Sequence, residues 1–172
     1  NPGDFRSRVS GPWNSAATWQ VYSFVAGWQT ATVSPTSANG VITILNTHSV
    51  NVPGTAPVTI DQTVVEAGGT LTANGSVTIA DGPGSDLTNS GTGAFFGPQL
   101  TIAANAVVDG SAIIQSMAAS NVNDGTFNTP FAFTGGTQTL SGSGSMRELI
   151  VNNTNGITLT SNHTVNQTLN FN

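Results

Sequence analysis

Two histidines, His48 and His163, are the first candidates for chemistry, because a neutral imidazole can accept a proton or ligate a metal ion. They are the only histidines in the chain, and each stands in a near-repeat, ITILNTHSVN or ITLTSNHTVN, with no carboxylate close in sequence. A catalytic histidine rarely has a twin in the same setting, whereas a repeated structural unit produces one. We therefore interpret both as turn residues that donate to a backbone carbonyl.

The charged residues show no catalytic pattern either. Asp81 and Asp86 flank a Gly-Pro-Gly-Ser loop and carry oxygen atoms of the kind that bind Ca²⁺, but their spacing fits neither an EF-hand nor a Gly/Asp nonapeptide array. Arg147 is followed directly by Glu148, which predicts a local ion pair or a pair on opposite faces. No nucleophile elbow, phosphate loop or His-plus-carboxylate motif is present. We predict no catalytic residue, no metal site and no cofactor.

Aromatic residues near the N-terminus are the best candidates for binding. Trp13, Trp19, Tyr22 and Trp28 offer flat apolar rings with a polar edge, which suit the CH-rich faces of sugars. Bulky aromatic residues in a non-repeating segment would equally cover the open end of a repeat stack. We favour a capping role and keep glycan contact as the alternative.

The elements that must position these residues change in kind near residue 40. Beyond it, short runs place Thr between two apolar side chains, as in Val58-Thr59-Ile60, Val77-Thr78-Ile79 and Leu100-Thr101-Ile102. This period of two is typical of a strand with one buried and one wet face. Pairs rich in Gly, Asn and Pro separate the runs and predict turns. The chain is therefore predicted to be all-β.

A sandwich and a solenoid both fit short strands separated by turns. The similarity of the two histidine-containing decapeptides and the uniform Thr-centred runs favour a parallel β-helix, because stacking similar strands buries one continuous apolar core. We predict that residues 41–172 form about six coils of roughly 20 residues each. Residues 1–40 are predicted to be an aromatic-rich N-terminal cap, and outward Thr and Asn side chains are expected to form ladders along the faces.

Composition narrows the function. Only 6% of the 172 residues are charged, the net charge is −5, and all three basic residues are arginines. This leaves no basic patch for nucleic acid or an anionic membrane. No apolar run reaches the roughly 20 residues of a membrane span, so we also expect no membrane insertion. The chain has no cysteine and begins with Asn, which is compatible with a mature secreted chain or an excised piece.

Several stretches resemble a known group of proteins. GTQTLSGSG at 136–144, LIVNNTNGITL at 149–159 and TVNQTLNF at 164–171 resemble the Thr/Asn-rich β-helix repeats of very large secreted surface proteins of the Bacteroidota. GDFRS at 3–7 and GPWN at 11–14 are similar to the N-terminal module of those proteins, and more loosely to a glycine-rich domain of animal extracellular proteins. The Bacteroidota proteins resemble adhesins and often end in a C-terminal sorting domain for export, which is absent here.

The resemblance implies a secreted or cell-surface location and a non-enzymatic structural or adhesive role. Expected partners are cell-surface or extracellular glycans or proteins. The chain still alternates apolar and polar residues at Leu169-Asn170-Phe171-Asn172, which predicts an open strand edge and core. Either the chain is a fragment of a longer solenoid or copies stack head to tail into an extracellular filament. A glycan-binding module, an ice-binding face of outward threonines and a β-helix polysaccharide lyase are the competing hypotheses.

Overall fold

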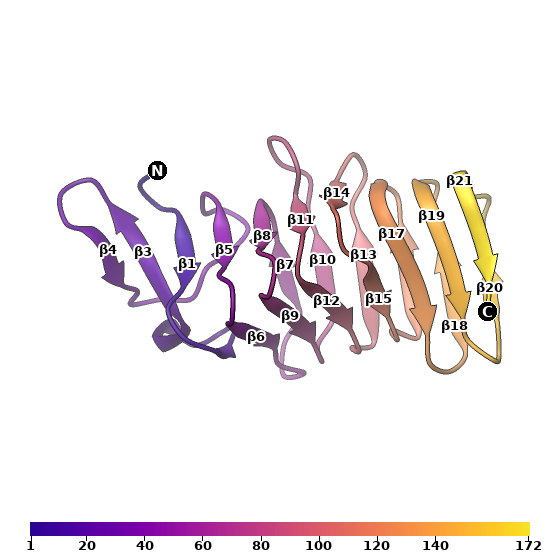
Figure 1. Ribbon diagram of the computed structural model, residues 1–172, viewed down its shortest axis with the longest axis horizontal. Coiled ribbons are helices and arrows are strands. Elements are labelled where there is room, and N and C mark those ends of the chain that lie inside the picture. Colours follow the sequence, from indigo (N-terminus) through magenta and orange to yellow (C-terminus); the bar gives the residue numbers. More distant parts are fainter.

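The computed structural model describes residues 1–172. The chain forms an elongated stack of β-strand coils (Figure 1). Each complete coil has three faces, called here the first, second and third face in chain order. The first four coils contain β5 (Ile42–Ile44), β6 (Ser49–Val52), β7 (Val58–Ile60), β8 (Thr63–Val65), β9 (Thr70–Ala73), β10 (Val77–Ile79), β11 (Leu87–Asn89), β12 (Thr92–Phe95), β13 (Gln99–Ile102), β14 (Val107–Gly110), β15 (Ile114–Ser116) and β16 (Ser120–Asn123).

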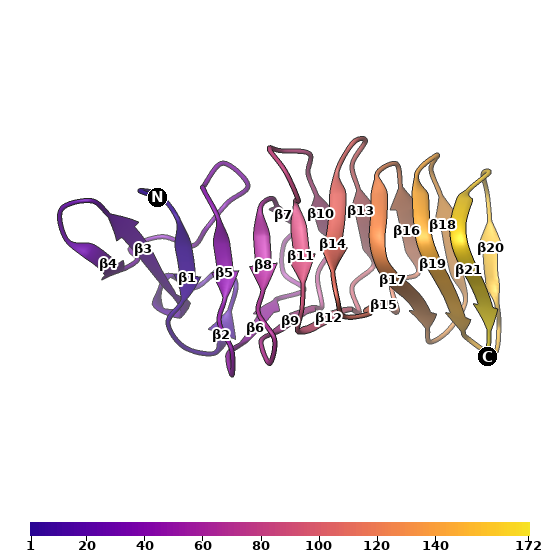
Figure 2. The same ribbon diagram turned by 45° about the horizontal axis from the view of Figure 1, so that its top comes forward.

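In the later coils, the strands of the first and second faces merge into one long bent strand, as Figure 2 shows. The fifth and sixth coils contain β17 (Thr126–Thr134), β18 (Gln138–Ser141), β19 (Ser145–Asn152) and β20 (Ile157–Leu159). A further strand, β21 (Thr164–Phe171), lies on β19 and begins a seventh coil. Register shifts mark the bend, between Phe127 and Pro130 in β17 and between Met146 and Glu148 in β19.

Every pairing between coils is parallel. The first and second faces belong to a 15-stranded sheet, and the third face is a separate 6-stranded sheet in the order β20-β18-β16-β13-β10-β7. The chain is thus a β-solenoid of about six turns, which confirms the predicted parallel β-helix and excludes the sandwich. Paired residues in neighbouring coils show how many residues one coil takes. Thr63 pairs with Ile42, 21 residues earlier, and Leu87 pairs with Thr63, 24 residues earlier, which is the longest coil.

The Thr-centred runs form strands for the reason the pattern predicts. In β5, Ile42 and Ile44 are fully buried while Thr43 points outward. Stacking repeats this arrangement, so the inward side chains form one hydrophobic cluster of 29 buried residues that runs from Phe5 to Val151. Burying each large aliphatic side chain contributes about 1.5–3 kcal/mol, so this continuous core is the main force that holds the coils together.

The N-terminal 40 residues form the first rung of this stack and also cover its N-terminal end. Two short strands, β1 (Phe5–Ser7) and β2 (Gly11–Pro12), pair in parallel with β5 and β6 and form an incomplete first rung. A hairpin of β3 (Trp19–Ser23) and β4 (Gly27–Thr30) then pairs antiparallel with β1 and covers that end of the molecule (Figure 1). The cap and the coils therefore share one core.

The two similar decapeptides that contain His48 and His163 are not equivalent parts of a structural repeat. Their similarity was one of our reasons for predicting a repeat fold, and that reason is wrong. His48 lies between β5 and β6, at the corner of the first and second faces, whereas His163 lies between β20 and β21, at the corner of the third and first faces. The two similar decapeptides thus occupy different places in the coil. Repetition is instead carried by the apolar periodicity, which every coil shares whatever its other residues.

The expected Asn ladders are only partly on the outside. Asn89, Asn121 and Asn123 are buried. Asn121 donates through Nδ2 to the carbonyl oxygen of Ala118 at 2.9 Å, and Asn123 accepts from the amide of Gly125 at 3.2 Å. Backbone groups at the tight corners have no partner in the next strand, so inward amide side chains supply one.

One short 3₁₀ turn, η1 (Ala16–Thr18), is the only helical segment. No helix in the structure is long and apolar enough to cross a membrane.

Candidate binding surface at the N-terminal cap

The four aromatic residues singled out in the sequence separate into two pairs. Trp13 and Trp19 pack edge to face inside the cap, with ring centroids 5.0 Å apart, and are 2% and 0% exposed. Their indole N–H groups donate to the carbonyl oxygens of Pro35 at 3.2 Å and Trp13 at 2.8 Å, respectively. These rings close the end of the core, and in this structure neither offers a face to a sugar.

Tyr22 and Trp28 lie on the outside of the hairpin. They face each other in the β3–β4 register, with ring centroids 5.3 Å apart at 65°. The guanidinium carbon of Arg6 lies 4.4 Å from the centre of the Trp28 ring. Arg6 Nε also donates to Gln20 Oε1 at 2.9 Å. We call this half-exposed group of Arg6, Gln20, Tyr22 and Trp28 the cap patch.

Antiparallel pairing explains how this patch forms. Arg6 lies opposite Gln20 in the β1–β3 ladder, and both have side chains on the same outward face as Tyr22 and Trp28, because residues two apart share a face of a strand. The patch combines aromatic ring surface, one positive charge and one amide. Such a set can stack on an apolar ligand face and form hydrogen bonds with hydroxyl or carboxylate oxygens. Arg6 and Gln20 could not be predicted as part of this group from the sequence, because only the strand pairing brings them beside the aromatic residues.

The histidines are placed at corners, and neither contacts a carboxylate. His48 Nδ1 lies 2.8 Å from Ser7 Oγ, and His163 Nε2 lies 3.3 Å from Ser161 Oγ. The Ser7 hydroxyl is fully buried and also accepts from the amide of Leu45 at 2.9 Å. A serine held in this way stabilises the corner and is not accessible to a substrate.

The buried carboxylate at the 81–86 loop, Asp86, accepts hydrogen bonds from backbone amides. Asp86 is buried, and its two oxygens accept from the amides of Gly82 at 2.8 Å and Val107 at 2.6 Å. No group of three or more His, Cys, Asp or Glu residues could hold a metal ion.

Burial, together with a hydrogen bond to the Asp86 carboxyl, raises the pKa of Asp61 to about 6.

Of the two arrangements predicted for Arg147 and Glu148, the structure shows no ion pair and places the two residues on different faces of the coil. They follow one another at the bulge where β19 turns between two faces, and both remain half-exposed. Glu148 accepts instead from Asn170 Nδ2 in the next coil, at 3.2 Å.

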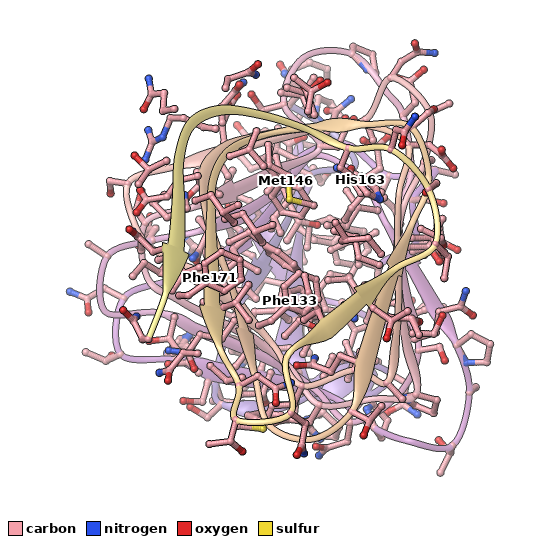
Figure 3. The ribbon with its side chains drawn as sticks, turned by 90° about the vertical axis from the view of Figure 1, so that its right-hand side faces the viewer. Phe133, Met146, His163 and Phe171 are labelled. Carbon is pink, nitrogen blue, oxygen red and sulfur yellow. The ribbon has the colours of Figure 1, made fainter.

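The opposite end of the stack is apolar and open. A groove of about 230 Å³ there is lined by Leu149, Val151, Ile157, Leu159, His163, Val165, Leu169 and Phe171. Leu169 and Phe171 are 51% and 74% exposed. Figure 3 looks onto this end, with Phe133 and Met146 inside the coils and Phe171 on the last strand.

Fold and surface together define the class as a capped parallel β-solenoid with an aromatic patch at one tip. No protein-family description matches the chain, and neither a curated protein nor a solved structure matches it. Function is therefore inferred from the geometry.

Proposed function

We propose that this chain is a non-enzymatic secreted β-solenoid that serves as a structural and adhesive segment of a cell-surface or extracellular protein. The observation that carries the proposal is the separation of roles along the molecule. A continuous core and parallel ladders span its length, whereas one cluster of surface aromatic rings with a cation beside them, the cap patch, lies at one tip. A stiff spacer that presents a contact patch at its end fits this arrangement.

The patch favours glycans as partners of the tip. Tyr22 and Trp28 give ring surface at low entropic cost, and Arg6 and Gln20 give donors and acceptors for hydroxyl groups. Single contacts of this kind are weak, so useful adhesion comes from many copies displayed together.

A glycan array probed with multivalent protein tests the adhesive part. Binding is expected for the native chain and is expected to fall below detection for Trp28→Ala. The matched control is Phe24→Ala, because Phe24 is an exposed aromatic residue of the same hairpin outside the patch. Binding that survives Trp28→Ala, or that falls equally in both variants, would remove the glycan role of the patch.

Antibody labelling of the source cells tests the location. Labelling of intact cells or of the culture medium is expected. Signal that requires permeabilised cells would overturn the extracellular assignment.

A second candidate function is a self-assembling subunit of an extracellular filament. The exposed apolar side chains of the last coil favour it, because such surface tends to be covered by a partner. The β3–β4 hairpin opposes it, since it covers the end on which the next copy would stack.

A further inference from the structure

The outer surface of the 6-stranded sheet carries two columns of mostly small polar side chains, which run side by side over β13, β16 and β18. The first column, in register from coil to coil, is Thr59, Thr78, Thr101, Val122 and Ser141. The second column is Gln99, Ser120, Thr139 and Thr158. Seven of these nine side chains carry a hydroxyl group, and the one valine keeps the branched shape of a threonine. We call this surface the hydroxyl face.

The hydroxyl face is held in a fixed geometry. The inward neighbours of the columns, such as Ile79, Leu100 and Leu140, are buried, so the strands cannot rotate. Thr139 Oγ1 donates to the carbonyl oxygen of Ala119 in the preceding coil at 3.3 Å, which also restrains its rotamer. A surface prepared in this way loses little entropy when it binds.

The chemistry of this surface differs from that of the other two. No strand of the 6-stranded sheet contains a charged or aromatic residue. By contrast, Asp109 and Arg147 lie on the first face and Glu148 lies on the second. The hydroxyl face therefore fits a partner that is itself neutral and rich in hydroxyl groups or water.

The spacing of the columns narrows the partner further. Neighbouring strands repeat at about 4.8 Å, and residues two apart on one strand lie about 6.6–6.8 Å apart. The strand spacing is similar to the repeat of oxygen atoms along the a axis of hexagonal ice, and residues two apart repeat somewhat more closely than oxygen atoms along its c axis. Threonine suits such a lattice, because its methyl group orders the adjacent water and its hydroxyl group fixes the register.

We propose that the hydroxyl face binds the surface of ice, through a layer of water ordered by the two columns. A crystalline polysaccharide is a different partner with a repeating hydroxyl surface. It is less well matched, because the face offers no aromatic ring on which a sugar can stack.

The test uses the full chain and two variants within one coil. Thr101→Tyr places a bulky ring in the first column. Thr88→Tyr is the matched control, because Thr88 is an outward threonine of β11 on the first face of the same coil. Circular dichroism melts of both variants report whether the fold is retained.

Thermal hysteresis, ice-crystal shape and partition into a growing ice front are then measured. The native chain and Thr88→Tyr are expected to depress the freezing point, to facet crystals and to enter the ice. Thr101→Tyr is expected to lose most of the hysteresis. Absence of hysteresis and partition in the native chain would overturn the proposal, as would equal losses in two folded variants. Sedimentation with microcrystalline cellulose or chitin, without any effect on ice, would assign the face to a polysaccharide instead.

Discussion

At the scale of single residues, the N-terminal aromatics show how position in the strand decides role. Trp19 begins β3 and points into the core, whereas Trp28 in the next strand points outward beside Arg6. The sequence alone shows two tryptophans in similar polar surroundings. Only the pairing of β3 with β1, and of β4 with β3, determines which ring is buried.

We expect this difference to appear in stability. Trp19→Ala leaves a large cavity and removes a buried hydrogen bond, so the free energy of unfolding should fall by about 3–5 kcal/mol. Trp28→Ala removes a half-exposed ring and should cost less than about 1.5 kcal/mol. Denaturant titrations measure both values. Similar losses for the two variants would contradict the division into core and surface rings.

Asp61 carries a second prediction, on pH dependence. Its pKa is raised to about 6 by burial and by the hydrogen bond to Asp86, so the folded state holds a proton that the unfolded chain releases near pH 4. The stability from this proton is fully present below about pH 4 and is lost as the pH rises through about 6.

The amide in Asp61→Asn imitates the protonated carboxyl group at every pH. Between pH 4 and 7 the native chain should therefore lose about 1–2 kcal/mol relative to this variant, allowing for partial screening by solvent. Thermal melts across this pH range measure the difference. Parallel pH profiles for the two proteins would show that Asp61 holds no extra proton.

At the scale of elements, the corners between faces depend on contacts that no local pattern reveals. A Cβ atom on Gly97 would collide with the backbone of Gly75 in the preceding coil, and one on Gly144 would collide with the carbonyl oxygen of Gly125. Neither Gly97 nor Gly144 has a positive φ. These glycines are required by the close approach of two coils, where turn chemistry alone would admit other residues.

Gly97→Ala is therefore expected to lower the free energy of unfolding by about 1–3 kcal/mol, because a backbone atom blocks the added methyl group. Gly136→Ala is the control, since a Cβ atom there meets nothing within 4 Å. It should change stability by less than about 0.5 kcal/mol. Denaturant titration distinguishes the two, and a harmless Gly97→Ala would argue against the close stacking of corners.

The elements also show what the sequence can and cannot predict. The Thr-centred strands and the Gly-rich turns are local, so their pattern predicts them, and about six coils follow from their spacing. The inward turn of Asn121 and the merging of two faces in β17 depend on neighbouring coils. The cap patch also needs this long-range information, because Arg6 meets Trp28 only after the hairpin folds back.

At the scale of the whole molecule, the two ends of the stack differ. A hairpin and two buried tryptophans close one end, while Leu169 and Phe171 remain exposed at the other. This polarity would allow contacts at the open end without an unlimited stack.

If the open end drives association, the double variant Leu169→Ser/Phe171→Ser should sediment as a monomer at concentrations where the native chain forms larger species. Sedimentation velocity over a concentration series measures this. A native chain that stays monomeric at high concentration would count against the filament alternative. The matched control is Phe24→Ser, an exposed phenylalanine at the closed end.

The central claim is that the coils stack in register into one rigid rod. Thr59 and Thr160 lie on the same side of the third face. The amide of Thr160 donates to the carbonyl oxygen of Leu140 and so extends the hydrogen-bond ladder of the 6-stranded sheet. The chain contains no native cysteine, so spin labels can be attached at Thr59→Cys and Thr160→Cys alone. Five strand steps predict that the two attachment points lie about 24 Å apart. Double electron–electron resonance should give a single narrow distance distribution near this value, whereas a broad distribution or a clearly different mean would contradict the stacked rod.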